Sequence, residues 1–92
     1  MLLKDRLLQN ADLWRMVKEE GERQVRKWGI QERTPFEWIA YVTEEVGEMA
    51  KAISNHSYFG GPQSEVVKEA IHAATLLLKI AEMYIHLPYE DR

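Results

Sequence analysis

The sequence contains no cysteine, which excludes disulfide frameworks, thiolate zinc sites and cysteine nucleophiles. It also lacks an excess of positive charge, because the formal net charge is -3 and the pI is about 5.6. No global positive field is therefore present to attract a nucleic-acid backbone or an anionic membrane. Long hydrophobic runs are missing too, and no stretch approaches the length of a membrane span.

The one local group of positive residues is interleaved with acidic ones: Glu19, Glu20, Glu22, Arg23, Arg26 and Lys27. A mixed run of this kind is typical of a solvated, ion-paired helix face, so we expect no binding to nucleic acid. The stretch from Met1 to Leu8 is too short and too interrupted by charges to be a signal peptide. We therefore expect a cytoplasmic protein that does not attach to membranes.

Hydrophobic residues nevertheless make up 46% of the chain, and three of them are tryptophan. This is more apolar material than a disordered chain carries, and more than a short three-helix monomer easily hides. A chain of 92 residues has room for one domain only. We predict a single domain over residues 1–92 that associates with further copies of itself.

Apolar residues recur at three- or four-residue steps between about Asp12 and Lys27, which predicts a first helix with one buried face. They are Trp14, Val17, Gly21, Val25 and Trp28. The second helix is predicted to begin at Thr34-Pro35-Phe36-Glu37, which places a capping hydroxyl, a proline and a capping glutamate in the right order. Its apolar pattern ends at Ser54.

Turn-forming residues between Ser54 and Gln63 predict the main loop. The third helix is predicted from about Gln63 to Ile85, and its apolar middle must be enclosed. No segment has the pattern of a strand. We therefore predict an all-α fold, with the second and third helices in an antiparallel hairpin and the first packed across it. Oligomerisation through the third helix would complete a four-helix-bundle-type core.

Three glutamates stand within little more than one turn of the second helix: Glu44, Glu45 and Glu48. At 100° per residue, Glu44 lies nearly opposite the apolar stripe, Glu48 lies on its flank, and Glu45 borders the buried face. Glu45 and Glu48 can thus point toward a neighbouring helix. Such a pair is either the start of a metal site or an ordinary solvated face in a chain with 15 acidic residues.

The third helix carries one continuous polar stripe: Glu65, Glu69, His72, Leu76 and Lys79. If it faces Glu45 and Glu48, carboxylates and an imidazole converge. Magnesium prefers such oxygen ligands and commonly bridges carboxylates to phosphates, whereas imidazole suits manganese or zinc better. Whether Glu65 joins the site depends on where the preceding loop lies.

Two further residues near these glutamates bear on a ligand site. Gly47 costs roughly 1 kcal/mol in a helix interior relative to alanine, so we expect it to allow close helix approach or room for a ligand. Trp38 and Tyr41 share the flank of Glu45 and Glu48, where a ring can stack on a nucleobase. An ordinary core role for Trp38 is the alternative.

The segment Thr43-Glu44-Glu45-Val46-Gly47-Glu48-Met49-Ala50-Lys51-Ala52-Ile53, followed after a loop by Glu69-Ala70-Ile71-His72, resembles the MazG-type nucleotide pyrophosphohydrolases. The resemblance extends from Trp38 to about Glu82. In this family an E-x-x-E motif on one helix and an E-x-x-D motif on the next bind magnesium. The enzymes cleave nucleoside triphosphates to the monophosphate and pyrophosphate, and they are dimers or tetramers of short helical chains.

The resemblance implies a set of ligands for Mg²⁺, or for Mn²⁺, consisting of Glu45, Glu48, Glu69 and His72. It lets Lys51 approach a phosphate oxygen, Trp38 contact the substrate, and Glu44 or Glu45 orient the attacking water. His72 stands where the family has aspartate. This loss of a negative charge should weaken magnesium binding, so His72 either binds another metal, binds phosphate when protonated, or marks a member that no longer catalyses. A histidine with a plain hydrogen bond is the remaining alternative.

The resemblance therefore predicts a nucleoside triphosphate pyrophosphohydrolase of housecleaning type, built as a homodimer or homotetramer. A non-catalytic relative that binds nucleotide or metal is the alternative, and a purely structural helical module is the third interpretation. No residue identifies the base or the sugar of a substrate.

Overall fold

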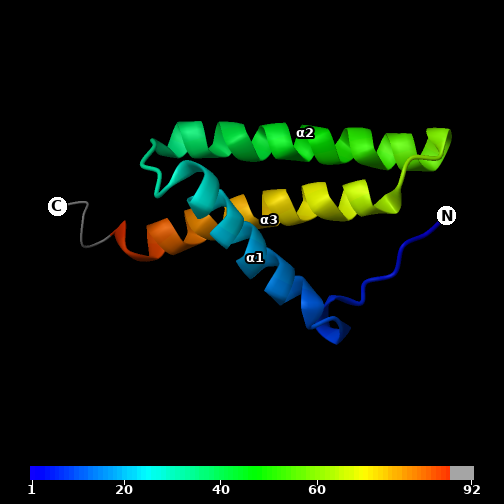
Figure 1. The fold of residues 1–92 in the computed structure, drawn as a ribbon, viewed down its shortest axis with the longest axis horizontal. Helices are drawn as coiled ribbons and strands as arrows, with labels where there is room; N and C mark the ends of the chain where they lie inside the picture. Colours follow the sequence, from blue (N-terminus) through cyan, green and yellow to red (C-terminus); the bar gives the residue numbers. More distant parts are fainter. Residues whose placement is uncertain (88–92) are drawn as a thin grey trace.

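The computed structural model describes residues 1–87 and consists of three α-helices after a short 3₁₀ turn, η1 (Leu7–Gln9). The helices are α1 (Asp12–Trp28), α2 (Pro35–Phe59) and α3 (Gln63–Ile85). Figure 1 shows α2 and α3 side by side and antiparallel, with α1 crossing α3 at an angle. The predicted all-α fold, its hairpin and the position of the first helix are confirmed.

The start of α2 is fixed by the predicted capping box. The Thr34 hydroxyl accepts a hydrogen bond from the Glu37 backbone N–H at 3.2 Å, and the Glu37 carboxylate accepts one from the Thr34 N–H at 3.0 Å. Two backbone donors that the helix itself leaves free are thereby satisfied. This cap sets the point at which α2 leaves the α1–α2 connection.

The end of α2 differs from the prediction, because the helix continues past Ser54 to Phe59 and the loop shrinks to residues 60–62. Residues 54 to 59 are exposed, so an apolar stripe is not needed there to continue the helix. The helix stops at Gly60, whose φ of 76° lies in the left-handed region. The Gly61 N–H then donates to the Asn55 carbonyl at 3.1 Å, and a side chain at Gly61 would overlap that of Asn55.

The core within one chain is small. Only Trp38, Val42 and Ala73 are buried apolar residues among residues 1–87. The radius of gyration is 15.2 Å, whereas a compact domain of this length has about 12 Å. The molecule is elongated, with extents of 50 × 27 × 26 Å. A single chain therefore leaves much of its apolar surface in contact with water.

The third helix, predicted to be enclosed, is covered by α2 along one side and by α1 along another. Leu77 and Leu78 remain 50% and 46% exposed. They belong to an apolar groove of about 420 Å³ between α1 and α3, lined by Leu7, Leu13, Trp14, Val17, Ala70, Ile71, Ala74, Leu77 and Leu78. Within residues 1–87, none of the helices combines the length and hydropathy needed to cross a membrane.

Candidate functional site

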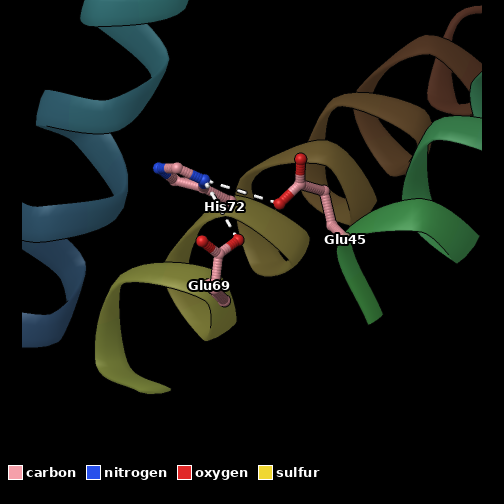
Figure 2. A group of neighbouring side chains, drawn as sticks. All are labelled: Glu45, Glu69 and His72. Carbon is pink, nitrogen blue, oxygen red and sulfur yellow. Dashed lines mark ion pairs between the residues drawn. The ribbon is translucent and has the colours of Figure 1, made fainter. Parts of the chain in front are cut away.

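One carboxylate of α2 meets two side chains of α3 near the middle of the hairpin. The His72 Nδ1 atom lies 3.5 Å from Glu45 Oε2 and 3.6 Å from Glu69 Oε2. Figure 2 shows the two carboxylates converging on the same nitrogen, while the other ring nitrogen points toward α1. One ligand atom from each residue lies within 4.8 Å of the others, so the three could hold a metal ion together. We call Glu45, Glu69 and His72 the central cluster.

A third carboxylate comes from α1. Glu20 is only 8% exposed, and its Oε1 lies 3.4 Å from His72 Nε2, on the side of the ring opposite the central cluster. Arg23 donates to both Glu20 oxygens, at 2.8 and 2.7 Å, and Gln24 Nε2 donates to Oε2 at 2.7 Å. Two hydrogen bonds from one guanidinium and one from an amide hold this carboxylate in place.

The expectation that the charged run of α1 is a solvated face is wrong at Glu20. Glu20 and Gln24 are buried, whereas Glu19 and Glu22 are exposed. Glu20 follows Val17 by three residues, so it borders the apolar stripe of α1 as Glu45 borders that of α2. The same position at the border of an apolar stripe would have identified Glu20 from the sequence.

Lys79, on the predicted polar stripe of α3, contacts the residues that hold Glu20. Its Nζ donates to Gln24 Oε1 at 2.5 Å, so Gln24 connects the ammonium to Glu20. Burial lowers the pKa of Lys79, and the charge of Glu20 opposes that effect. Residues of the polar stripe of α3 therefore contact α1 as well as α2.

The carboxylates of the site differ in their electrostatic environment. Burial raises the pKa of Glu45, and the neighbouring Glu69 raises it further, although His72 opposes both. Burial also acts to raise the pKa of Glu20, but the hydrogen bonds from Arg23 and Gln24 and the nearby positive charges outweigh it and lower the pKa. Glu45 therefore holds a proton more readily than an ordinary glutamate, and Glu20 holds its charge more firmly.

A cavity of about 300 Å³ adjoins these residues, and its walls include Trp28, Arg33, Trp38, Tyr41, Glu20, Glu45 and His72. The Arg33 guanidinium lies 4.8 Å from the centre of the Tyr41 ring. Three fully buried polar atoms on these walls have no hydrogen-bond partner among the described residues: Arg33 Nε, Trp38 Nε1 and Glu45 Oε2. A buried polar atom without a partner costs free energy.

Four predicted residues lie outside the central cluster. Glu44 is exposed, as its place opposite the apolar stripe predicts. Glu48 is 55% exposed, and its Oε1 lies 3.7 Å from the Nζ of the exposed Lys51. Glu65 is also exposed, and its carboxylate lies 3.8 Å from the Lys68 ammonium.

Trp38 and Gly47 complete the predicted set. Trp38 is 5% exposed and combines both predicted roles, because it belongs to the core and lines the cavity. The expected close helix approach at Gly47 is wrong within this chain, because a Cβ built there meets nothing within 4 Å.

Comparisons of the chain with known protein families, with curated proteins and with solved structures found no match.

Proposed function

We propose that the protein is a metal-dependent nucleoside triphosphate pyrophosphohydrolase that releases a nucleoside monophosphate and pyrophosphate. The observation that carries this proposal is the convergence of Glu45, Glu69 and His72 from two facing helices. These are three of the four residues at which the resemblance to MazG-type enzymes puts a metal. Surplus or damaged nucleotides are the substrates expected of a housecleaning enzyme of this type.

The donor set of the central cluster fits a divalent ion. Two carboxylates and an imidazole supply oxygen and nitrogen ligands, and the buried Glu45 Oε2 atom accepts no hydrogen bond within residues 1–87. Glu45, Glu69 and His72 would hold Mg²⁺ or Mn²⁺. Such an ion neutralises the charge of a triphosphate and polarises the phosphorus under attack.

The neighbouring cavity fits the remainder of a nucleotide. Aromatic walls such as those of Trp38 and Tyr41 can stack on a base. The guanidinium groups of Arg23 and Arg33 offer positive charge to the phosphates. Lys51 is exposed, and its Nζ lies 3.7 Å from Glu48 Oε1; the resemblance assigns it to a phosphate oxygen.

Glu45 is the better of the two candidates for activating water. It belongs to the central cluster, 3.5 Å from His72 Nδ1, where a carboxylate can orient a water molecule. Glu44 is exposed and contributes no contact to the cluster. Glu45 would orient the water and take its proton, and no covalent intermediate is needed.

One observation favours a second function, which is binding of nucleotide or metal without catalysis. His72 replaces an acidic ligand and is surrounded by Glu20, Glu45 and Glu69, so these carboxylates can be neutralised in part by a protonated imidazole. A chain that uses this arrangement instead of a metal would bind nucleotides as a sensor or as a partner protein.

The same proposal includes self-association as a homodimer or homotetramer. The apolar groove between α1 and α3 and the small core of a single chain both leave apolar surface that a second copy would cover. The additional helices would complete a four-helix-bundle-type core.

The test is product analysis by ion-exchange chromatography. Ribo- and deoxynucleoside triphosphates are incubated with the native chain and either Mg²⁺ or Mn²⁺. Monophosphate and pyrophosphate are expected in equal amounts. Glu69→Gln should abolish them, and Glu82→Gln, an exposed change on the same helix, should not.

The absence of turnover with either metal on every nucleotide would reject the enzyme. In that case, nucleotide-dependent thermal stabilisation of the native chain would favour the binding protein, because a ligand that binds only the folded form raises its stability. Equal turnover by Glu69→Gln and the native chain would show that the central cluster is not the active site.

A further inference from the structure

The two nitrogens of His72 face different surroundings. Nδ1 faces the central cluster, where two carboxylate oxygens lie 3.5 and 3.6 Å away. Nε2 faces only Glu20 among the carboxylates of the described chain, at 3.4 Å. An N–H on Nε2 can therefore donate toward Glu20 and leave the lone pair of Nδ1 directed at Glu45 and Glu69.

Glu20 is fixed well enough to determine this choice. Its carboxylate is buried, and it receives three hydrogen bonds from Arg23 and Gln24. Those bonds leave its Oε1 beside the imidazole. Metal-binding histidines commonly donate their second ring N–H to a carboxylate, which sets the tautomer and the direction of the ring.

The spacing of the carboxylate oxygens from His72 Nδ1 is compatible with a tetrahedral ion. Two ligands at about 2.1 Å from a tetrahedral zinc ion lie roughly 3.4 Å apart. Adjacent ligands of octahedral magnesium, at about 2.0 to 2.1 Å, lie roughly 2.9 Å apart. The observed separations from Nδ1 to the two carboxylate oxygens, 3.5 and 3.6 Å, are closer to the first arrangement.

We propose that the central cluster is a site for a divalent transition metal of the zinc type in preference to magnesium, and that Glu20 is its positioning residue, acting through the tautomer of His72. This inference rests on the metal-binding part of the proposed function. Three protein ligands leave a further position for a phosphate oxygen or water, as in catalytic zinc sites. The imidazole in place of a carboxylate makes the donor set a better one for zinc than for magnesium.

The first test measures metal affinity without any nucleotide, by calorimetric titration of the native chain with Zn²⁺ and with Mg²⁺. His72→Asp converts the donor set to carboxylates only, and we expect the ratio of Zn²⁺ to Mg²⁺ affinity to fall at least tenfold. His86→Asn is the control, because His86 and Glu82 form an exposed histidine–carboxylate pair at the C-terminal end of the same helix. An unchanged ratio in His72→Asp would overturn the proposal, as would an equal fall in His86→Asn.

The second test addresses Glu20. Loss of such an outer carboxylate typically costs 10- to 100-fold in metal affinity, so Glu20→Gln should weaken Zn²⁺ binding by about that factor. Because Glu20→Gln can also loosen α1, the tautomer is measured directly on the native chain by ¹⁵N NMR of the histidine rings. With Zn²⁺ bound, His72 should carry its proton on Nε2. A proton on Nδ1, or no change in the His72 signals on adding Zn²⁺, would contradict the proposal.

These outcomes are separate from those of the proposed function. Zn²⁺ binding at His72 without any turnover would uphold the metal site and reject the enzyme. Turnover that depends on Mg²⁺, with unchanged His72 signals in Zn²⁺, would uphold the enzyme and reject the zinc-type site.

Discussion

Glu45 and Glu69 place two carboxylates beside one imidazole. The resulting shift in the pKa of Glu45 makes the stability of the metal-free protein depend on pH. Burial and the charge of Glu69 raise the pKa of Glu45 in the folded chain above the ordinary value of 4.5. The folded state therefore keeps a proton that the unfolded chain has lost. As the pH rises from about 4.5 through the higher folded pKa, the folded state loses stability relative to the unfolded state.

The metal-free Glu45→Gln variant should consequently be more stable than the native chain at pH 7, because it removes a buried charge. We expect its Tm to be a few degrees higher, and the difference should shrink as the pH falls through the folded pKa of Glu45 and be lost well below pH 4.5, where Glu45 is protonated in both states. Thermal melts followed by circular dichroism between pH 4 and pH 8 measure this. Glu44→Gln removes a charge from the exposed neighbouring position, and it should change the Tm little. An equal gain in both variants would show that net charge, and not the cluster, is responsible.

Glu48 is the residue at which the resemblance and the geometry differ most. The resemblance makes it a metal ligand, whereas its carboxylate lies beside Lys51 and is 55% exposed. We expect Glu69→Gln to lower metal affinity at least tenfold and Glu48→Gln to lower it less than threefold, as measured by titration without nucleotide. If both variants lost affinity equally, Glu48 would have to turn into the site when the metal binds.

The residues of the central cluster could be predicted from sequence because the apolar and polar pattern of each helix defines their positions on it. Glu45 borders an apolar stripe, and Glu69 and His72 lie three residues apart on the polar stripe of α3. Glu20 also borders an apolar stripe, but the interleaved charges around it favour a solvent-exposed face, and for this reason it is not selected from the sequence. Its burial depends on the angle at which α1 crosses α3, which is a property of tertiary packing.

At the scale of single elements, the two ends of α2 differ in how well the sequence predicts them. Its start is encoded by a specific pair of side chains, Thr34 and Glu37, whose hydrogen bonds require that spacing. Its end was placed too early, because Ser54 and Asn55 have low helix propensity and the apolar stripe ends there. Propensity differences of a few tenths of a kcal/mol are too small to stop a formed helix, whereas the left-handed Gly60 does.

We predict that loss of the capping hydroxyl destabilises the chain. Thr34→Ala removes the acceptor of the Glu37 N–H, and we expect it to lower the free energy of unfolding by about 1 kcal/mol. Chemical denaturation measures the loss. Thr43→Ala removes a hydroxyl in the interior of the same helix, where it bonds only the Ile39 carbonyl, and it should cost less than about 0.5 kcal/mol. A cost at Thr43 as large as that at Thr34 would contradict the role of the cap.

At the scale of the whole molecule, the chain has more apolar surface than its own fold covers. The core of one chain has three buried apolar residues within residues 1–87. The helices α1 and α2 cover only part of the surface of α3. Gly47 and Val46 lie on open parts of α2 as well. The composition predicts this imbalance, but it does not specify which face a second copy would cover, since several exposed stripes could serve.

The groove between α1 and α3 is the face that we expect self-association to bury, because its lining is almost wholly apolar. Sedimentation equilibrium of the native chain should give a mass at least twice that of the 10.8 kDa monomer. Leu78→Glu places a charge on this groove and should shift the chain to monomer, because burying an unpaired carboxylate in an apolar interface costs more than the contact gains. Leu8→Glu makes the same change at a leucine that is 96% exposed and does not line the groove, so it should leave the assembly intact. A monomeric native chain would refute self-association. An assembly that survives Leu78→Glu but not Leu8→Glu would move the interface to the N-terminal segment.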